Sequence, residues 1–153
     1  MSLSTKDAVS AVFRQAIRKD LQKVLRTGDD WDRYVAITSE ATQRIKAEEA
    51  AHARDFPQRL AEAKQMILRE ENGIRLEHPL PTWAEKHSDA DALDRKAGER
   101  VRADYGHRIA VITKDELDAF RDLSAEIRAR NAPTSRHEYQ LTRSYNRNGP
   151  TQT

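Results

Sequence analysis

The spacing of the apolar residues constrains the fold of this chain more than any other feature. Val, Ile, Leu and aromatic residues recur every three or four positions through most of the sequence before Asn131, as one buried face of a helix requires. The chain has only 5 Gly and 5 Pro, and 34% of its residues are charged, so it is poor in turn formers. We therefore predict an all-α fold, a small bundle of four to five helices.

Capping residues predict where the first two helices begin and end. Ser4 is a suitable N-cap for the first helix, and Gly28 follows its last turn as a stop signal. A second helix is expected to begin behind Asp29 or Asp30. Because proline lacks an N–H donor, Pro57 is expected to end or kink this second helix.

The middle of the chain contains the one stretch that interrupts the helical pattern. Residues 58–71 are predicted to form a third helix or a kinked continuation of the second, with Gly73 as its C′ residue. The following "GIRLEHPLPTW" contains two prolines and is predicted to be a crossing loop. Its residues 74–78 could also form a short strand.

The second half of the chain contains three capping boxes. Those at 82–85 and 88–91 predict a helical turn followed by a longer helix over 88–105. The strongest one, at 113–116, predicts the start of the last helix. Residues 108–113 are rich in β-branched side chains and could be a strand or a helix, with helix preferred.

The predicted organisation is one helical bundle domain over 1–131 and a flexible basic tail over 132–153. The last 26 residues contain five arginines against one acidic residue, with two tyrosines among them. Arginine and stacking aromatic rings attract phosphate backbones and unpaired bases, although a solvated tail that maintains solubility explains the same composition. The residues concerned are Arg128, Arg130, Arg136, Tyr139, Arg143, Tyr145 and Arg147.

The first predicted helix has a second basic feature. Arg18, Lys19, Lys23 and Arg26 are predicted to lie on the side opposite Phe13 and its apolar stripe. Such a positive face could bind a nucleic-acid backbone or anionic lipid, or it could be a solvated helix face.

The stretch "EEAAHARDF" places Glu49 and His52 three residues apart, and the apolar stripe that passes through Ile45 and Phe56 predicts that both are buried. A buried carboxylate and imidazole need partners, so the simplest interpretation is a hydrogen bond to a neighbouring helix or to Asp55.

The same nine residues resemble the metal-binding helix of ferritin-like and rubrerythrin-like proteins. That resemblance implies a carboxylate and histidine site for iron or manganese, in which Asp20 stands where the family has a glutamate from the first helix. A second pair, Asp104 and His107, could supply the other half-site, but His107 is predicted to face outward.

The remaining features favour a non-enzymatic function. The chain has no cysteine, no glycine-rich phosphate loop and no nucleophile motif, which excludes several enzyme classes and disulfide frameworks. No apolar run is long enough to span a bilayer and no leader is recognisable, so a cytoplasmic location is expected. The leading hypothesis is a helical binding protein, either a protein adaptor that binds a partner or itself, or a nucleic-acid accessory factor without a cofactor. The alternative is the ferritin-like metal-binding bundle.

Overall fold

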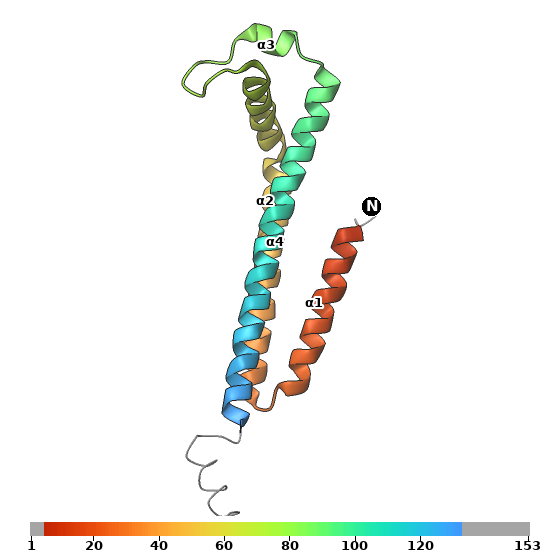
Figure 1. Cartoon of the computed structure of the whole chain (residues 1–153), viewed down its shortest axis with the longest axis vertical. Helices are drawn as coiled ribbons and strands as arrows, with labels where there is room; N and C mark the ends of the chain where they lie inside the picture. Colours follow the sequence, from red (N-terminus) through yellow and green to blue (C-terminus); the bar gives the residue numbers. More distant parts are fainter. Residues whose placement is uncertain (1–4, 133–153) are drawn as a thin grey trace, which may run out of the picture. The chain divides into compact units, whose positions relative to one another are not determined.

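The computed structural model describes residues 5–132, with side chains from residue 11 onward, and these residues form four α-helices and no strand (Figure 1). The predicted all-α class is therefore confirmed. Residues 74–78 form part of the loop between two helices, and residues 108–113 are helical, which settles both ambiguous stretches. The helices are α1 Thr5–Val24, α2 Gly28–Asn72, α3 Thr82–Lys86 and α4 Ala90–Asn131.

The connection between α1 and α2 lies earlier in the chain than predicted. α1 ends at Val24, and Gly28 is the first residue of α2 rather than the stop of the helix before it. The prediction that α2 begins behind Asp29 or Asp30 was therefore late by two or three residues. The predicted N-cap of α1, Ser4, lies outside the described residues.

Pro57 does not end the second helix. α2 continues through it for a total of 45 residues, so the predicted third helix is a continuation of the second. Proline removes one intrahelical hydrogen bond, at a cost that the rest of a long helix packed against a partner can offset.

The end of α2 was predicted correctly. Gly73 has a φ of 64°, and the N–H of Ile74 donates to the carbonyl of Arg69 over 2.9 Å. This six-residue closure with a left-handed glycine is the Schellman motif, which satisfies carbonyls that the helix end leaves without donors.

The start of α4 is set by a residue that the sequence pattern did not single out. The Asp89 carboxylate accepts hydrogen bonds from the backbone N–H groups of Asp91 and Ala92, so Asp89 is the N-cap. Ser88, the predicted cap, donates its hydroxyl to the carbonyl of Glu85.

α4 then runs without interruption past the predicted helix start at 113–116. The Thr113 hydroxyl donates to the Ile109 carbonyl one turn earlier, as a threonine inside a helix does. The predicted capping box is therefore not formed.

Contacts between the helices group the chain into two compact units. Unit 1 combines the residues up to Ile37 with those from Leu117 onward, and unit 2 is Thr38–Glu116. α2 and α4 both contribute to each unit, and ion pairs in each show that the two helices run antiparallel, for example Glu48 with Arg108 and Glu71 with Lys96 in unit 2.

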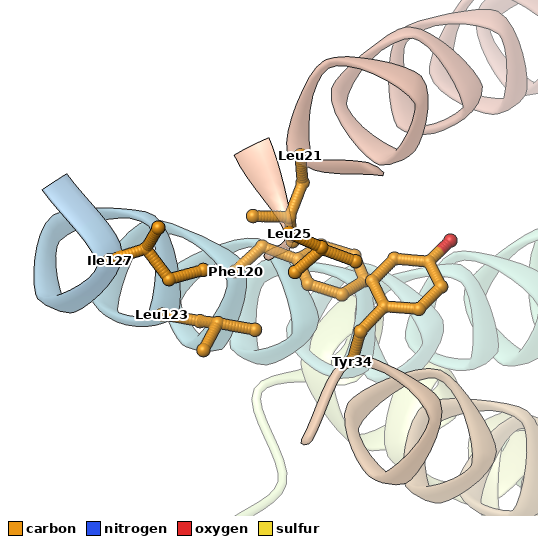
Figure 2. Packing of buried hydrophobic residues seen from close by; sticks show 6 residues of the cluster. All are labelled: Leu21, Leu25, Tyr34, Phe120, Leu123 and Ile127. Atoms are coloured by element: carbon orange, nitrogen blue, oxygen red, sulfur yellow. The ribbon is translucent and has the colours of Figure 1, made fainter. Parts of the chain in front are cut away.

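Unit 1 has a core in which three helices meet (Figure 2). The Tyr34 and Phe120 rings stack with centroids 5.6 Å apart, and Gln22 of α1 donates a 3.0 Å hydrogen bond to the Tyr34 hydroxyl. The buried members of this core are Leu21, Leu25, Tyr34, Phe120, Leu123 and Ile127.

Unit 2 is a helical hairpin with smaller side chains in its core. Ala97 is fully buried, which allows the backbones of α2 and α4 to approach closely. Ion pairs between the two helices flank this core, among them Arg100 with Glu70 and Lys96 with Glu71, both at 2.7 Å. The buried core residues are Ala63, Ile67, Leu68, Leu93, Ala97 and Val101.

The continuity of α2 leads to a stability prediction. Pro57 is exposed, so replacing it by alanine supplies the missing N–H donor without removing a buried ring. We expect Pro57→Ala to stabilise the protein by about 1–3 kcal/mol in urea unfolding followed by circular dichroism. Pro57→Gly is the control, because it restores the donor but gains about 1 kcal/mol less than alanine. A loss of stability in Pro57→Ala would contradict this account.

Candidate functional site

The connection between α1 and α2 is organised by a capping box that the sequence analysis missed. The Thr27 hydroxyl accepts a 3.1 Å hydrogen bond from the Asp30 N–H, and the Asp30 carboxylate accepts one of 3.3 Å from the Thr27 N–H. A further N–H, that of Arg26, donates to the same carboxylate oxygen. Thr27 is therefore the N-cap of α2, and the signal was readable in the sequence as "TGDD".

Asp30 also binds the last turn of α4. Its side chain is only 1% exposed, and the Arg130 guanidinium donates two hydrogen bonds to it, of 3.1 and 2.6 Å. This fork geometry is the strongest arrangement of an arginine and a carboxylate. The Arg130 guanidinium holds the pKa of Asp30 far below its usual range, against the opposing effect of burial.

Arg130 therefore has a different role from the one predicted. The sequence predicted that it belongs to a basic segment that binds nucleic acid, whereas its guanidinium forms an ion pair with the Asp30 carboxylate of unit 1. Beside it, Arg33 and Glu126 form a second ion pair between α2 and α4, which is more exposed. Nothing in the sequence around Arg130 indicates a partner 100 residues away.

The predicted basic face of α1 is only partly formed. Lys19, Lys23 and Arg26 are exposed, and Lys23 forms a 3.6 Å ion pair with Asp20. Arg18 is half-buried, and its Nε atom is fully buried, so the prediction that it faces away from the core was wrong. At 100° per residue Arg18 lies only 60° from the core residue Leu21.

A groove between α1 and α4 is the most distinctive surface feature of unit 1. Its volume is about 290 Å³, close to the lower limit of small-molecule pockets, and it is open to solvent. Apolar residues form its floor and polar ones its edges. The lining residues are Ile17, Asp20, Leu21 and Val24 of α1, with Phe120, Arg121, Ser124 and Arg128 of α4.

One exposed apolar side chain continues this groove toward the start of α1. Phe13 is 55% exposed and lies one turn before Ile17. At 100° per residue Phe13 falls within about 40° of Ile17, Asp20 and Val24, so all four lie along one line of the helix. The groove and Phe13 thus form one apolar strip, which we call the α1 strip.

Arg128 was predicted as a binding residue and does line this groove, whereas Arg121 was missed. The missed signal was the spacing of the two arginines, because residues seven apart lie on the same side of a helix. The predicted tail residues Arg136, Tyr139, Arg143, Tyr145 and Arg147 lie outside the described residues.

In unit 2, His52 makes different contacts from those predicted. Its ring stacks on Tyr105 with centroids 4.2 Å apart and meets Phe56 edge-on. Among the described residues, neither Glu49 nor Asp55 hydrogen-bonds to it, and Asp55 pairs with Arg54 instead. Burial, with added repulsion from Glu49 and Glu48, raises the pKa of the Tyr105 hydroxyl.

Glu49 is exposed, so the prediction that it lies on the buried stripe was wrong. The half-buried carboxylate is Glu48, which lies 3.9 Å from Arg108 of α4. From Ile45 the buried line advances by three residues rather than four. Both steps are compatible with a helix, and only the position of α4 decides between them.

The described residues do not bring together the ligands that the metal-binding alternative requires. Asp20 belongs to unit 1, and Glu49 and His52 to unit 2. Over residues 5–132, no group of three His, Asp or Glu side chains is placed to hold a metal ion. Asp104 pairs with Arg108, and His107 is exposed, as predicted.

Comparison with known proteins does not indicate a function for this chain. The chain matches no model of a known protein family, no curated protein sequence and no solved structure. Within the part of the chain that the structure describes, no helix has both the length and the apolar character needed to cross a membrane.

The buried Asp30 carboxylate leads to a prediction about pH. Because its pKa is lowered in the folded state, the stability it contributes is complete above the unfolded value of about 3.9 and is lost as the pH falls below it. We expect Asp30→Asn to lower the melting temperature at pH 7, and the difference in melting temperature from the wild type to narrow as the pH falls from about 4 toward 2.

The matched control for this experiment is Glu126→Gln, which removes the exposed ion pair with Arg33. Exposed pairs contribute little, so this variant should melt close to the wild type. An equal loss in both variants, or a gap in Asp30→Asn that does not depend on pH, would contradict the role given to Asp30.

Proposed function

We propose that this chain is a non-enzymatic helical protein that acts by binding a helix of another protein along the α1 strip. The supporting observation is that Phe13, one of only 3 Phe residues in the chain, is 55% exposed in line with an open apolar groove. Single exposed apolar residues are ordinary, but a continuous strip beside a groove is typical of a binding surface.

The mode of binding follows from the helical geometry. Three helices form unit 1, and α1 and α4 present a groove of the kind into which an amphipathic helix packs its apolar face. A helix in that position would complete a four-helix arrangement and cover the floor residues Ile17, Val24 and Phe120.

Substitution of Phe13 tests this proposal. We expect Phe13→Ser to change the free energy of unfolding by no more than about 0.5 kcal/mol, because the side chain is largely exposed in the folded chain. The same variant should bind the partner at least about tenfold more weakly, since a central aromatic contact is lost. Lys19→Ser, an exposed change on another side of α1, is the control and should bind normally.

The partner is to be identified by a photo-reactive benzophenone amino acid at position 13 or, as control, at position 19 of the full chain, in cells of its natural source. One protein cross-linked from position 13 and not from position 19, and lost from complexes of Phe13→Ser, supports the proposal. Equal adducts from both positions, adducts only with a second copy, or none at all would reject it.

A second candidate function, nucleic-acid binding, is favoured by one observation. Lys19 and Lys23 are exposed and four residues apart, which places them along one side of α1, and the exposed Arg26 follows two residues after the end of that helix. If they contact phosphates, replacing all three by alanine should reduce the salt dependence of binding to duplex DNA by about three units of log–log slope. Removal of residues 132–153 tests the contribution of the tail. No binding at low salt would reject this candidate.

A further inference from the structure

The two walls of the groove between α1 and α4 differ in charge. The α4 wall carries Arg121 and Arg128, and neither side chain forms an ion pair or hydrogen bond with any of the described residues. The α1 wall carries Asp20, whose charge is partly balanced by Lys23 at 3.6 Å. The groove is therefore positive along one side only.

The unpaired state of these arginines contrasts with that of their neighbours in unit 1. Arg33 pairs with Glu126, and Arg130 pairs with Asp30. Other arginines of unit 1 thus have a carboxylate partner, whereas Arg121 and Arg128 have none among the described residues. Two exposed guanidiniums beside an apolar floor favour a ligand that supplies both carboxylates and apolar side chains.

The spacing of the two arginines specifies the shape of such a ligand. Seven residues separate Arg121 from Arg128, which is two turns or about 10 Å along α4. A second helix lying along α4 places side chains seven residues apart at the same interval. Residues three and four positions after the first of these point toward the floor at Phe120 and Val24.

We infer that the groove between α1 and α4 binds an acidic amphipathic helix of another protein, with carboxylates at positions i and i+7 against Arg121 and Arg128 and apolar residues between them. This inference rests on the proposed function, and it adds the chemical class of the partner.

Charge argues against other occupants from this chain. The sequence after Asn131 has three arginines and one glutamate, so it is repelled by the arginines of the α4 wall. The exposed side of α1 from a second copy is also basic, with Lys19 and Lys23, and Arg26 follows just after this helix. Unit 1 as a whole has 13 basic and 9 acidic residues, which favours an acidic partner over a second copy.

Designed peptides provide the test. The probe is a 21-residue amphipathic helix, a length of about 30 Å, with Glu at i and i+7 and Leu at i+3 and i+4. Two companion peptides carry Gln or Lys at the Glu positions. Binding to the full chain is measured by fluorescence anisotropy at low and high salt.

We expect the Glu peptide to bind roughly tenfold more tightly than the Gln peptide, with the difference shrinking at high salt, and more tightly still than the Lys peptide. The double variant Arg121→Glu/Arg128→Glu should reverse this order and prefer the Lys peptide. Lys19→Glu is the matched control, since it changes an exposed charge elsewhere on unit 1 and should retain the wild-type order. Circular dichroism establishes that each variant is folded.

Each remaining outcome overturns the inference. These outcomes are no binding of the Glu peptide at about 1 mM, equal binding of all three peptides, no reversal in the double variant, and an equal effect of Lys19→Glu. The cross-linking experiment at position 13 separates this failure from that of the proposed function. A position-specific protein adduct with no Glu-peptide preference leaves a binding protein whose partner is not an acidic helix, whereas no adduct rejects both.

Discussion

Unit 1 depends on the Asp30 carboxylate more than on any other polar group. A buried charge must be paired and fully hydrogen-bonded to be tolerated, and Asp30 meets this requirement with donors from Arg26, Thr27 and Arg130. The same side chain thus fixes the turn between α1 and α2, starts α2 and holds the end of α4. The apolar core beside it can pack in one way only when these three elements are in place.

The helices could be predicted from the sequence because their apolar spacing depends only on local geometry. The Gly73 C′ residue and the loop after it were also predicted correctly. The errors occurred where tertiary contacts decide between local alternatives. The helix that contains Pro57 is long enough to tolerate it. The Thr113 hydroxyl donates a hydrogen bond to a carbonyl of its own helix instead of capping a new one.

The candidate site was less predictable from the sequence, because charged residues form ion pairs with residues that are distant in the sequence. Arg130 and Arg128 look alike in the sequence, yet Arg130 is bound by Asp30 and Arg128 lies at a groove without an ion-pair partner among the described residues. Glu48 and Glu49 likewise differ by a rotation of 100° about the helix, which only the position of α4 resolves. The capping box of Thr27 and Asp30 was readable, but its link to α4 was not.

The charged residues of the two units differ in their partners. In unit 2 the charged residues of α2 and α4 face each other in ion pairs, for example Arg100 with Glu70 and Lys64 with Asp94. Such pairs set the register of a helical hairpin more than its stability. In unit 1, Arg121 and Arg128 have no such partners among the described residues, and the proposed function locates binding there.

The division of the chain has a consequence for its synthesis on the ribosome. Unit 2 is one continuous segment, Thr38–Glu116, and its contacts can form as soon as that segment has emerged. Unit 1 must wait, because Leu21 and Tyr34 are made before unit 2 and their packing partners Phe120 and Leu123 are made after it. Closing a loop of this length slows folding and leaves the apolar side of α1 uncovered until Phe120 and Leu123 have emerged. Once unit 2 has folded, its hairpin brings Glu116 back toward Thr38, which shortens the loop that unit 1 has to close.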